Sequence, residues 1–204
     1  MDVEYLWATP LFTSSISESL RASTASSVLS LRGVPDASGA WTSHDRLHAM
    51  GEFAELTSSI IAFAEECCDS LSVKRDSLYI SAMWANTAPL GVAHMPHSHP
   101  NCMYSGLIYL QAPSGAEGTV FTDPRPASTV LRPSYSNPSP LVIGQDYKQV
   151  PTEGKMLLWP AWLEHGVMSG AHDPLHTRVS LSYNIMLRAS MGENTYHLDT
   201  RSLG

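Results

Sequence analysis

Residues 1–75 carry the spacing of apolar positions that is typical of helices. Over 51–71 the apolar residues recur three and four positions apart, which predicts an amphipathic helix. A weaker pattern over 17–31, followed by a glycine and a proline that stop a helix, predicts a second one. The apolar stretch 5–12 predicts a short strand. This part of the chain therefore reads as an N-terminal strand with supporting helices.

Beyond residue 75 the pattern changes to short segments rich in aromatic and β-branched residues, separated by proline and glycine turns. Five of these segments predict strands, at 78–86, 103–111, 118–123, 155–160 and 177–187. No helical pattern lies between them, which favours an antiparallel sandwich or barrel such as a jelly roll. The fold class we expect is mainly β with N-terminal helices, in a cupin-like jelly-roll barrel.

The length of 204 residues is most simply that of one domain with its own hydrophobic core. We divide it into the N-terminal part (1–75), a jelly-roll core (76–190) and a tail (191–204). The longest irregular piece, 125–145, contains four prolines. Loops of that length inside a compact domain are usually lids or binding loops, so we expect substrate contacts there.

Charge and cysteine content exclude several classes of partner and location. The net charge is −7, the pI is near 5.6 and no basic stripe occurs, which argues against nucleic acid. The N-terminus lacks the features of a signal peptide, and no apolar run approaches the roughly 18 residues of a membrane span. Two of the three cysteines, Cys67 and Cys68, are adjacent, which disfavours disulfides, and we expect both to be core thiols. We therefore expect a cytoplasmic protein without a nucleic-acid or membrane partner, and a homodimer is compatible with the sequence.

Histidines provide the candidate chemistry. His97 and His99 lie two positions apart in an extended segment, so their side chains share one face, with Cα atoms about 6.5–7 Å apart. Both imidazoles can then reach one metal ion. His165 follows a buried strand that ends in a turn and can face the same mouth of the barrel. A lone histidine is more often exposed or hydrogen-bonded to the protein, but three at these spacings predict a facial metal site.

The remaining histidines are weaker candidates. His94 stands three positions before His97, a spacing that suits a helix, which Pro96 disfavours. Four others lie in predicted loops and one in the tail: His44, His48, His172, His176 and His197.

Arg178 follows His165 by 13 residues, and Ser180 lies two positions further on the same strand face. A guanidinium can take both oxygens of a carboxylate, and the serine hydroxyl can donate a further hydrogen bond. The pair suits the distal carboxylate of an oxo-acid. An arginine on an apolar strand can instead pair with a core acid.

Two barrel families place histidines in this way. The sequence resembles a cupin at Gly91, His97, His99, Gly154, Pro160 and His165. The glutamate that a cupin needs shortly after the second histidine is missing, since Met103 and Tyr104 stand there.

The second resemblance covers nearly the whole chain and rests on an ordered set of motifs. They are Leu6-Trp7-Ala8-Thr9-Pro10-Leu11, Trp84-Ala85-Asn86, His97-Ser98-His99-Pro100-Asn101, Ser105-Gly106-Leu107-Ile108-Tyr109, Asp123-Pro124-Arg125, Gly154-Lys155, Trp159-Pro160-Ala161-Trp162-Leu163-Glu164-His165-Gly166-Val167 and Arg178-Val179-Ser180-Leu181-Ser182-Tyr183-Asn184. In this set the chain resembles the 2-oxoglutarate/Fe(II)-dependent oxygenases of the His-x-His-Pro type.

The resemblance implies a double-stranded β-helix in which Fe(II) is held by His97, His99 and His165. The wider superfamily usually has Asp or Glu at the second position. His99 stands there in this chain, and Asp123 is the alternative carboxylate. Arg178 and Ser180 would hold the far carboxylate of 2-oxoglutarate.

The activity that the resemblance implies is an O2-dependent decarboxylation of 2-oxoglutarate to succinate, coupled to hydroxylation of a small-molecule or amino-acid-like or peptide substrate. Further contacts to co-substrate or substrate are expected from four residues: Tyr109, Ser105, Asn86 and Asn184. The alternatives are a cupin-type metal dioxygenase or isomerase without 2-oxoglutarate, and a non-catalytic jelly-roll binding module.

Overall fold

The computed structural model describes residues 2, 4, 6–125, 130, 136, 146–171, 173–193 and 196–202. Its helices are α1 (Glu18–Leu31) and α2 (Ala54–Ser70), with two short 3-10 turns at Leu47–Ala49 and Gly51–Phe53. Its strands are β1 (Phe12–Ser15), β2 (Trp41–Thr42), β3 (Ser77–Leu90), β4 (His94–His97), β5 (Tyr104–Gln111), β6 (Thr119–Phe121), β7 (Tyr147–Gln149), β8 (Lys155–Pro160), β9 (His165–Val167), β10 (Asp173–Arg188), β11 (Ser190–Glu193) and β12 (Tyr196–Asp199).

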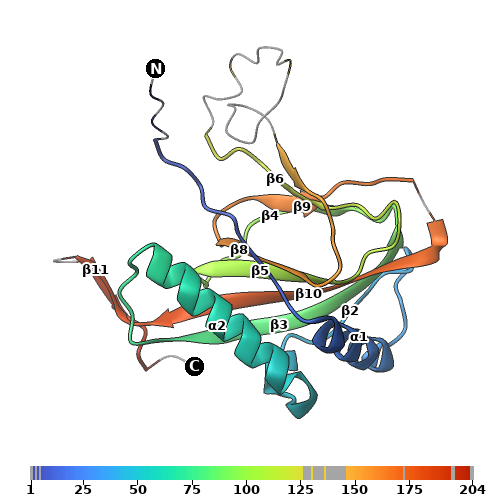
Figure 1. Ribbon diagram of the computed structural model, residues 1–204, viewed down its shortest axis with the longest axis horizontal. Helices are drawn as coiled ribbons and strands as arrows, with labels where there is room; N and C mark the ends of the chain where they lie inside the picture. Colours follow the sequence, from blue (N-terminus) through green and yellow to red (C-terminus); the bar gives the residue numbers. More distant parts are fainter. Residues whose placement is uncertain are drawn as a thin grey trace.

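Two antiparallel sheets form a sandwich, and this confirms the expected jelly roll. The larger sheet has the order β1-β8-β5-β10-β3-β2 and the smaller one β4-β9-β6-β7. From β3 to β10 the chain crosses repeatedly between the two sheets, which is the winding of a double-stranded β-helix. Figure 1 shows α1 and α2 on one side of the larger sheet and strands β4, β6 and β9 on the other.

Side chains along β10 alternate between two faces of the larger sheet. One face packs into the hydrophobic core beneath the helices, and the other faces the space between the two sheets. Val179, Leu181, Tyr183 and Ile185 are fully buried in the core that the helices share. The residues between them project from the opposite face of the strand, toward the smaller sheet. The long strand therefore carries a helix-facing apolar side and a more polar inner side that begins at Arg178.

Both predicted helices are confirmed, and local chemistry explains their bounds. Ser17 caps α1 by accepting a hydrogen bond from the backbone N–H of Leu20 at 3.2 Å. In α2 the buried residues recur at helical spacing on the face toward the larger sheet, at Leu56, Ile60 and Ala64. Cys67 and Cys68 lie on this buried face as free thiols, as expected.

The strand predicted at 5–12 is misplaced, because pairing begins only at Phe12, where β1 meets β8. Pro10 has no N–H to donate to a sheet, and Trp7 adopts a positive φ of 54° with its side chain 86% exposed. The predicted tail contains the β11–β12 hairpin. Most of the loop 125–145 lies outside the described residues.

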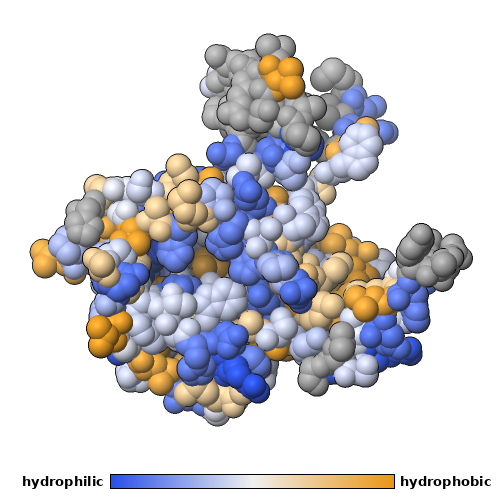
Figure 2. Space-filling view, turned by 180° about the vertical axis from the view of Figure 1, so that it is seen from behind, coloured by the Kyte–Doolittle hydropathy of each residue, from blue (hydrophilic) through white to orange (hydrophobic). Residues whose placement is uncertain are grey.

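The surface on the side opposite to Figure 1 mixes hydrophilic and hydrophobic residues (Figure 2). In the part of the chain that the structure describes, no helix combines the length and apolar character needed to cross a bilayer.

Candidate metal centre

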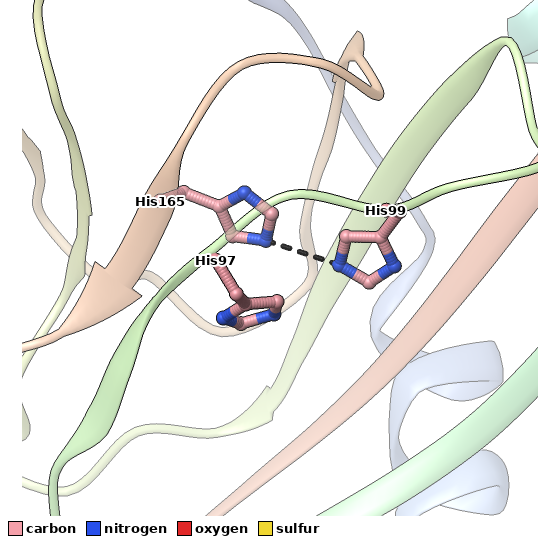
Figure 3. Close-up of side chains that lie close together, drawn as sticks. All are labelled: His97, His99 and His165. Carbon is pink, nitrogen blue, oxygen red and sulfur yellow. Dashed lines mark hydrogen bonds between the residues drawn. The ribbon is translucent and has the colours of Figure 1, made fainter.

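Two neighbouring strands of the smaller sheet bring the predicted ligands together. β4 and β9 pair antiparallel, and His97 stands directly opposite His165 in this register. His99 lies just beyond β4, where its backbone N–H donates to the carbonyl of Ala161 at 3.0 Å. This bond holds the segment after β4 against the turn that leads into β9. The three imidazoles consequently face one another (Figure 3).

The spacing of the ring nitrogens matches a shared metal ion. One ligand atom from each of His97, His99 and His165 lies within 4.8 Å of the other two. The Nε2 atoms of His99 and His165 are 3.3 Å apart. Two nitrogens bound at about 2.1 Å to one ion, at angles between tetrahedral and octahedral, are separated by about 3.0–3.4 Å. The separation of the His99 and His165 nitrogens is therefore that of two ligands bound to one ion.

Backbone carbonyls orient two of the three rings. Nδ1 of His97 lies 2.8 Å from the carbonyl oxygen of Met95, and Nδ1 of His165 lies 2.9 Å from that of Leu163. A carbonyl only accepts, so Nδ1 is the protonated nitrogen and donates. The lone pair is then on Nε2, on the other side of the ring. Such a bond through the second nitrogen is typical of histidines that bind metals.

Electrostatics keep the inner two histidines neutral. Burial lowers the pKa of His165 to about 4, although its bond to Leu163 acts in the opposite direction. Burial also lowers the pKa of His99 to about 4, and the neighbouring His97 contributes. A metal binds the neutral imidazole. Near neutral pH both side chains are therefore already in the protonation state that binds a metal. The donor set, three neutral imidazole nitrogens, suits Fe, Zn, Cu or Ni.

Among the described residues, the candidate metal cluster contains no carboxylate. Asp123, the alternative ligand, forms an ion pair with Arg125, whose Nη2 lies 2.7 Å from its Oδ2. The backbone N–H of Arg125 donates to the same side chain at 3.0 Å. The structure therefore joins His99, and not Asp123, to the other two histidines.

A cavity of about 90 Å³ extends from the triad into the sandwich. Four residues predicted to contact the co-substrate line it: Arg178, Ser180, Tyr109 and Asn86. The cavity wall also contains Trp84, His94, Gly106, Leu107, Thr119, Trp159, Gly166, Val167 and Ser182. Both sheets contribute, so the cavity lies between them.

Arg178 is the fixed positive charge of this cavity. It is only 6% exposed, and its Nη1 donates to the backbone carbonyl of Glu117 at 3.1 Å. Burial lowers its pKa, while Tyr109 and Glu117 act in the opposite direction. No carboxylate among the described residues forms an ion pair with it, so the reading of Arg178 as the partner of a core acid gains no support.

Two of the second-tier candidates lie elsewhere. Ser105 donates to Oδ1 of Asn184 at 3.0 Å, and neither residue lines the cavity. Their assignment to the co-substrate stays a prediction without geometric support. Asn86 does line the cavity, where its amide accepts from Thr42 at 2.9 Å and donates to Ser182 at 3.4 Å.

Two tryptophans pack on the ligands. Trp84 stacks on His99 with ring centroids 5.7 Å apart, and Trp159 meets His165 edge-on at 4.7 Å. Both stand in motifs named above, but their role as walls of the metal site was missed. Only the folded structure reveals it, because β3 and β8 bring the two tryptophan rings against His99 and His165.

The other histidines that the structure describes lie outside the cluster, and of these His94 alone lines the cavity. His176 is exposed and pairs with Asp173, and Nδ1 of His44 accepts from the backbone of Arg46. His48 lies on a short 3-10 turn, and His197 is exposed on β12. His172 falls outside the described residues.

Comparison with known proteins gives one family and many similar folds. The family described as "Putative 2OG-Fe(II) oxygenase" matches residues 82–184, half of the chain. No curated protein sequence matches significantly.

Three solved structures illustrate the similarity of fold. A Pseudomonas putida prolyl-4-hydroxylase is 12% identical with a TM-score of 0.60, over 89% of this chain and 94% of the other. The 2-oxoglutarate-dependent epimerase SnoN from nogalamycin biosynthesis is 14% identical with a TM-score of 0.64, over 88% and 79%. HygX from Streptomyces hygroscopicus, crystallised with nickel, 2-oxoglutarate and hygromycin B, is 12% identical with a TM-score of 0.60, over 88% and 83%. At such identities the likeness concerns the fold.

Proposed function

The chain belongs to the 2OG-Fe(II) oxygenase family, and from this premise we propose how its own residues perform an Fe(II)- and 2-oxoglutarate-dependent oxygenation. The observation that carries the proposal is the meeting of three histidines and one buried arginine in a single cavity.

The three histidines hold Fe(II) in this proposal. His97 and His165 present Nε2, because their Nδ1 atoms are engaged with backbone carbonyls. His99 supplies the third nitrogen, at ligand spacing from His165. A set of three protein ligands would leave positions open for a co-substrate and for O2, which is the requirement of non-haem iron oxygenase chemistry.

Arg178 and Ser180 hold the distal carboxylate of 2-oxoglutarate. Both line the cavity from β10, and among the described residues the buried guanidinium has one hydrogen-bond partner, the carbonyl of Glu117. A carboxylate desolvated there gains charge-assisted hydrogen bonds of about 1.5–3 kcal/mol each. Tyr109 and Asn86 add polar side chains to the cavity lining. The hydroxyl of Tyr109 is hydrogen-bonded to the hydroxyl of Thr119 at 2.8 Å.

The bound cofactors supply the oxidative chemistry, in which decarboxylation of 2-oxoglutarate to succinate is coupled to C–H hydroxylation of a substrate. The protein positions both groups and limits access of water, because Arg178 and His165 are buried. The substrate that we propose is a small molecule, an amino acid or a peptide side chain. The structural neighbours include a prolyl-4-hydroxylase and HygX with bound hygromycin B, which supports this range.

We also propose a cytoplasmic location. Three free cysteines, two of them adjacent and buried, suit a reducing compartment.

The test is anaerobic addition of Fe(II) and 2-oxoglutarate, followed by O2. We expect a weak visible charge-transfer band and then succinate. Arg178→Leu should raise the KM for 2-oxoglutarate by at least about tenfold, because the loss of even one charged hydrogen bond costs about 1.5–3 kcal/mol. Arg201→Leu, which removes an exposed arginine, is the matched control. Absence of both band and succinate in the wild type would refute the function, and an unaltered KM in Arg178→Leu would favour a cupin-type enzyme.

A further inference from the structure

A fourth histidine, His94, lines the same cavity but is not part of the metal cluster. It begins β4 and pairs with Val167, while His97 pairs with His165. Residues three apart on a regular strand point to opposite faces. A register shift between these two pairs breaks the alternation, and both histidines line the cavity as a result. Bulges of this kind re-aim side chains beside active sites.

His94 and Arg178 approach the cavity from opposite sheets. His94 belongs to the four-stranded sheet and Arg178 to the six-stranded one. They are close enough that the guanidinium helps to lower the pKa of His94, after burial and ahead of His97. Two groups that favour anions therefore line the same cavity.

Nothing in the described part of the chain fills the space between them with negative charge. Glu117 is the nearby acid that acts electrostatically on Arg178. One of its carboxylate oxygens accepts a hydrogen bond from the backbone of Gly91 at 3.3 Å, and Glu117 does not line the cavity. Neither ring nitrogen of His94 has a hydrogen-bond partner among the described residues. His94 thus offers an N–H for which the described residues supply no acceptor.

We propose that His94 is a second co-substrate-binding residue, which donates its imidazole N–H to the distal carboxylate of 2-oxoglutarate alongside Arg178. A carboxylate has about four lone-pair positions. Arg178 and Ser180 leave at least one of them for a donor from the opposite sheet. The inference rests on the proposed function, because it requires 2-oxoglutarate in this cavity with its distal end at Arg178.

The consequence is selectivity for a diacid. A 2-oxo acid without the distal carboxylate cannot bond to His94, so removal of the N–H should weaken 2-oxoglutarate alone. A hydrogen bond from a neutral donor to a charged acceptor implies an effect of about 10–100-fold in Kd.

The experiment is anaerobic calorimetric titration of the Mn(II)-loaded protein with 2-oxoglutarate and, separately, with pyruvate, which keeps the oxo-acid head. His94→Leu removes the N–H, and His94→Gln keeps an N–H donor. His176→Leu removes an exposed histidine and is the matched control. Mn(II) content and thermal midpoint are measured for each variant.

We expect His94→Leu to weaken 2-oxoglutarate by about 10–100-fold and to leave pyruvate unchanged. His94→Gln should recover part of the loss, and His176→Leu should match the wild type. Unchanged 2-oxoglutarate binding in His94→Leu would overturn this inference and leave the proposed function intact. Equal weakening of both oxo-acids, or loss of Mn(II), would overturn it as well, because His94 would then act through the metal or the fold. A wild type that binds Mn(II) but no 2-oxoglutarate would overturn the proposed function and the inference together.

Discussion

The metal-free protein should lose stability between pH 7 and pH 5, because the buried His165 must stay neutral in the folded state. Its imidazole is 7% exposed, and its pKa is lowered from 6.5 to about 4. As the pH falls below 6.5, the unfolded chain takes up a proton at this position while the folded chain does not. The stability contribution of neutral His165 is therefore present above the unfolded pKa and is lost as the pH falls, until about pH 4.

The magnitude follows from these two pKa values. Between pH 7 and pH 5, a group with an unfolded pKa of 6.5 and a folded pKa of about 4 reduces the free energy of unfolding by about 1.5–2 kcal/mol. Other groups add their own dependence on pH. Replacement of His165 by a side chain that does not titrate removes its share, together with its electrostatic coupling to His97 and His99.

The assay is urea denaturation of metal-free wild type and His165→Gln at pH values from 7 to 5. The unfolding free energy of the wild type should fall more steeply than that of His165→Gln. The difference in unfolding free energy between the two proteins should change by about 1.5–2 kcal/mol from pH 7 to pH 5. Ser182→Ala, which changes a cavity residue that does not titrate, should shift the curve and keep its slope. Curves for wild type and His165→Gln that run parallel across this range would show that His165 titrates alike in both states, and would refute the argument.

Two further predictions concern the ligand set and the packing behind it. His99→Ala should weaken Zn(II) binding by at least about tenfold, measured by competition with a chromophoric chelator, while the adjacent Ser98→Ala should not; equal affinities would exclude His99 as a ligand. Gly106→Ala should lower the unfolding free energy by about 1–3 kcal/mol or more, because its Cβ would overlap the ring of Tyr183 and lie 2.6 Å from the carbonyl oxygen of Leu157. Gly51→Ala, whose Cβ meets nothing within 4 Å, is the control, and equal stability of the two variants would contradict this reasoning.

The large elements of the fold could be predicted because their hydrophobic pattern is long. The pattern at 51–71 corresponds to the 3-10 turn and helix α2, and the segment 155–160 to β8. In α2, burial of one face imposes a helical period that the local sequence records, whereas β8 is buried on both faces and is visible as a short continuous apolar run. The strand at 5–12 was misplaced because apolar composition alone does not supply a partner, and pairing with β8 starts only at Phe12.

The strands that position the ligands escaped prediction. β4 has four residues and β9 three, and both are too short for any period to show. His97 and His99 could still be identified by their spacing. Residues two apart on an extended segment share a face, whatever the register of the strand. His94 is the opposite case. Regular alternation places it on the face opposite to His97, and only the register shift in the pairing with β9 brings it into the cavity.

The charge of the site links these observations. The usual facial triad includes a carboxylate, whereas the candidate cluster among the described residues has the neutral side chain of His99 beside His97 and His165. A divalent ion on three imidazoles would keep its full charge of two, and Arg178 adds another positive charge in the same cavity. Burial lowers the pKa of each of the cavity histidines His94, His99 and His165, so none of them adds a proton near neutral pH. The excess that remains is positive, and a dianion such as 2-oxoglutarate, with one end near the three histidines and the other at Arg178, would offset two of these three positive charges.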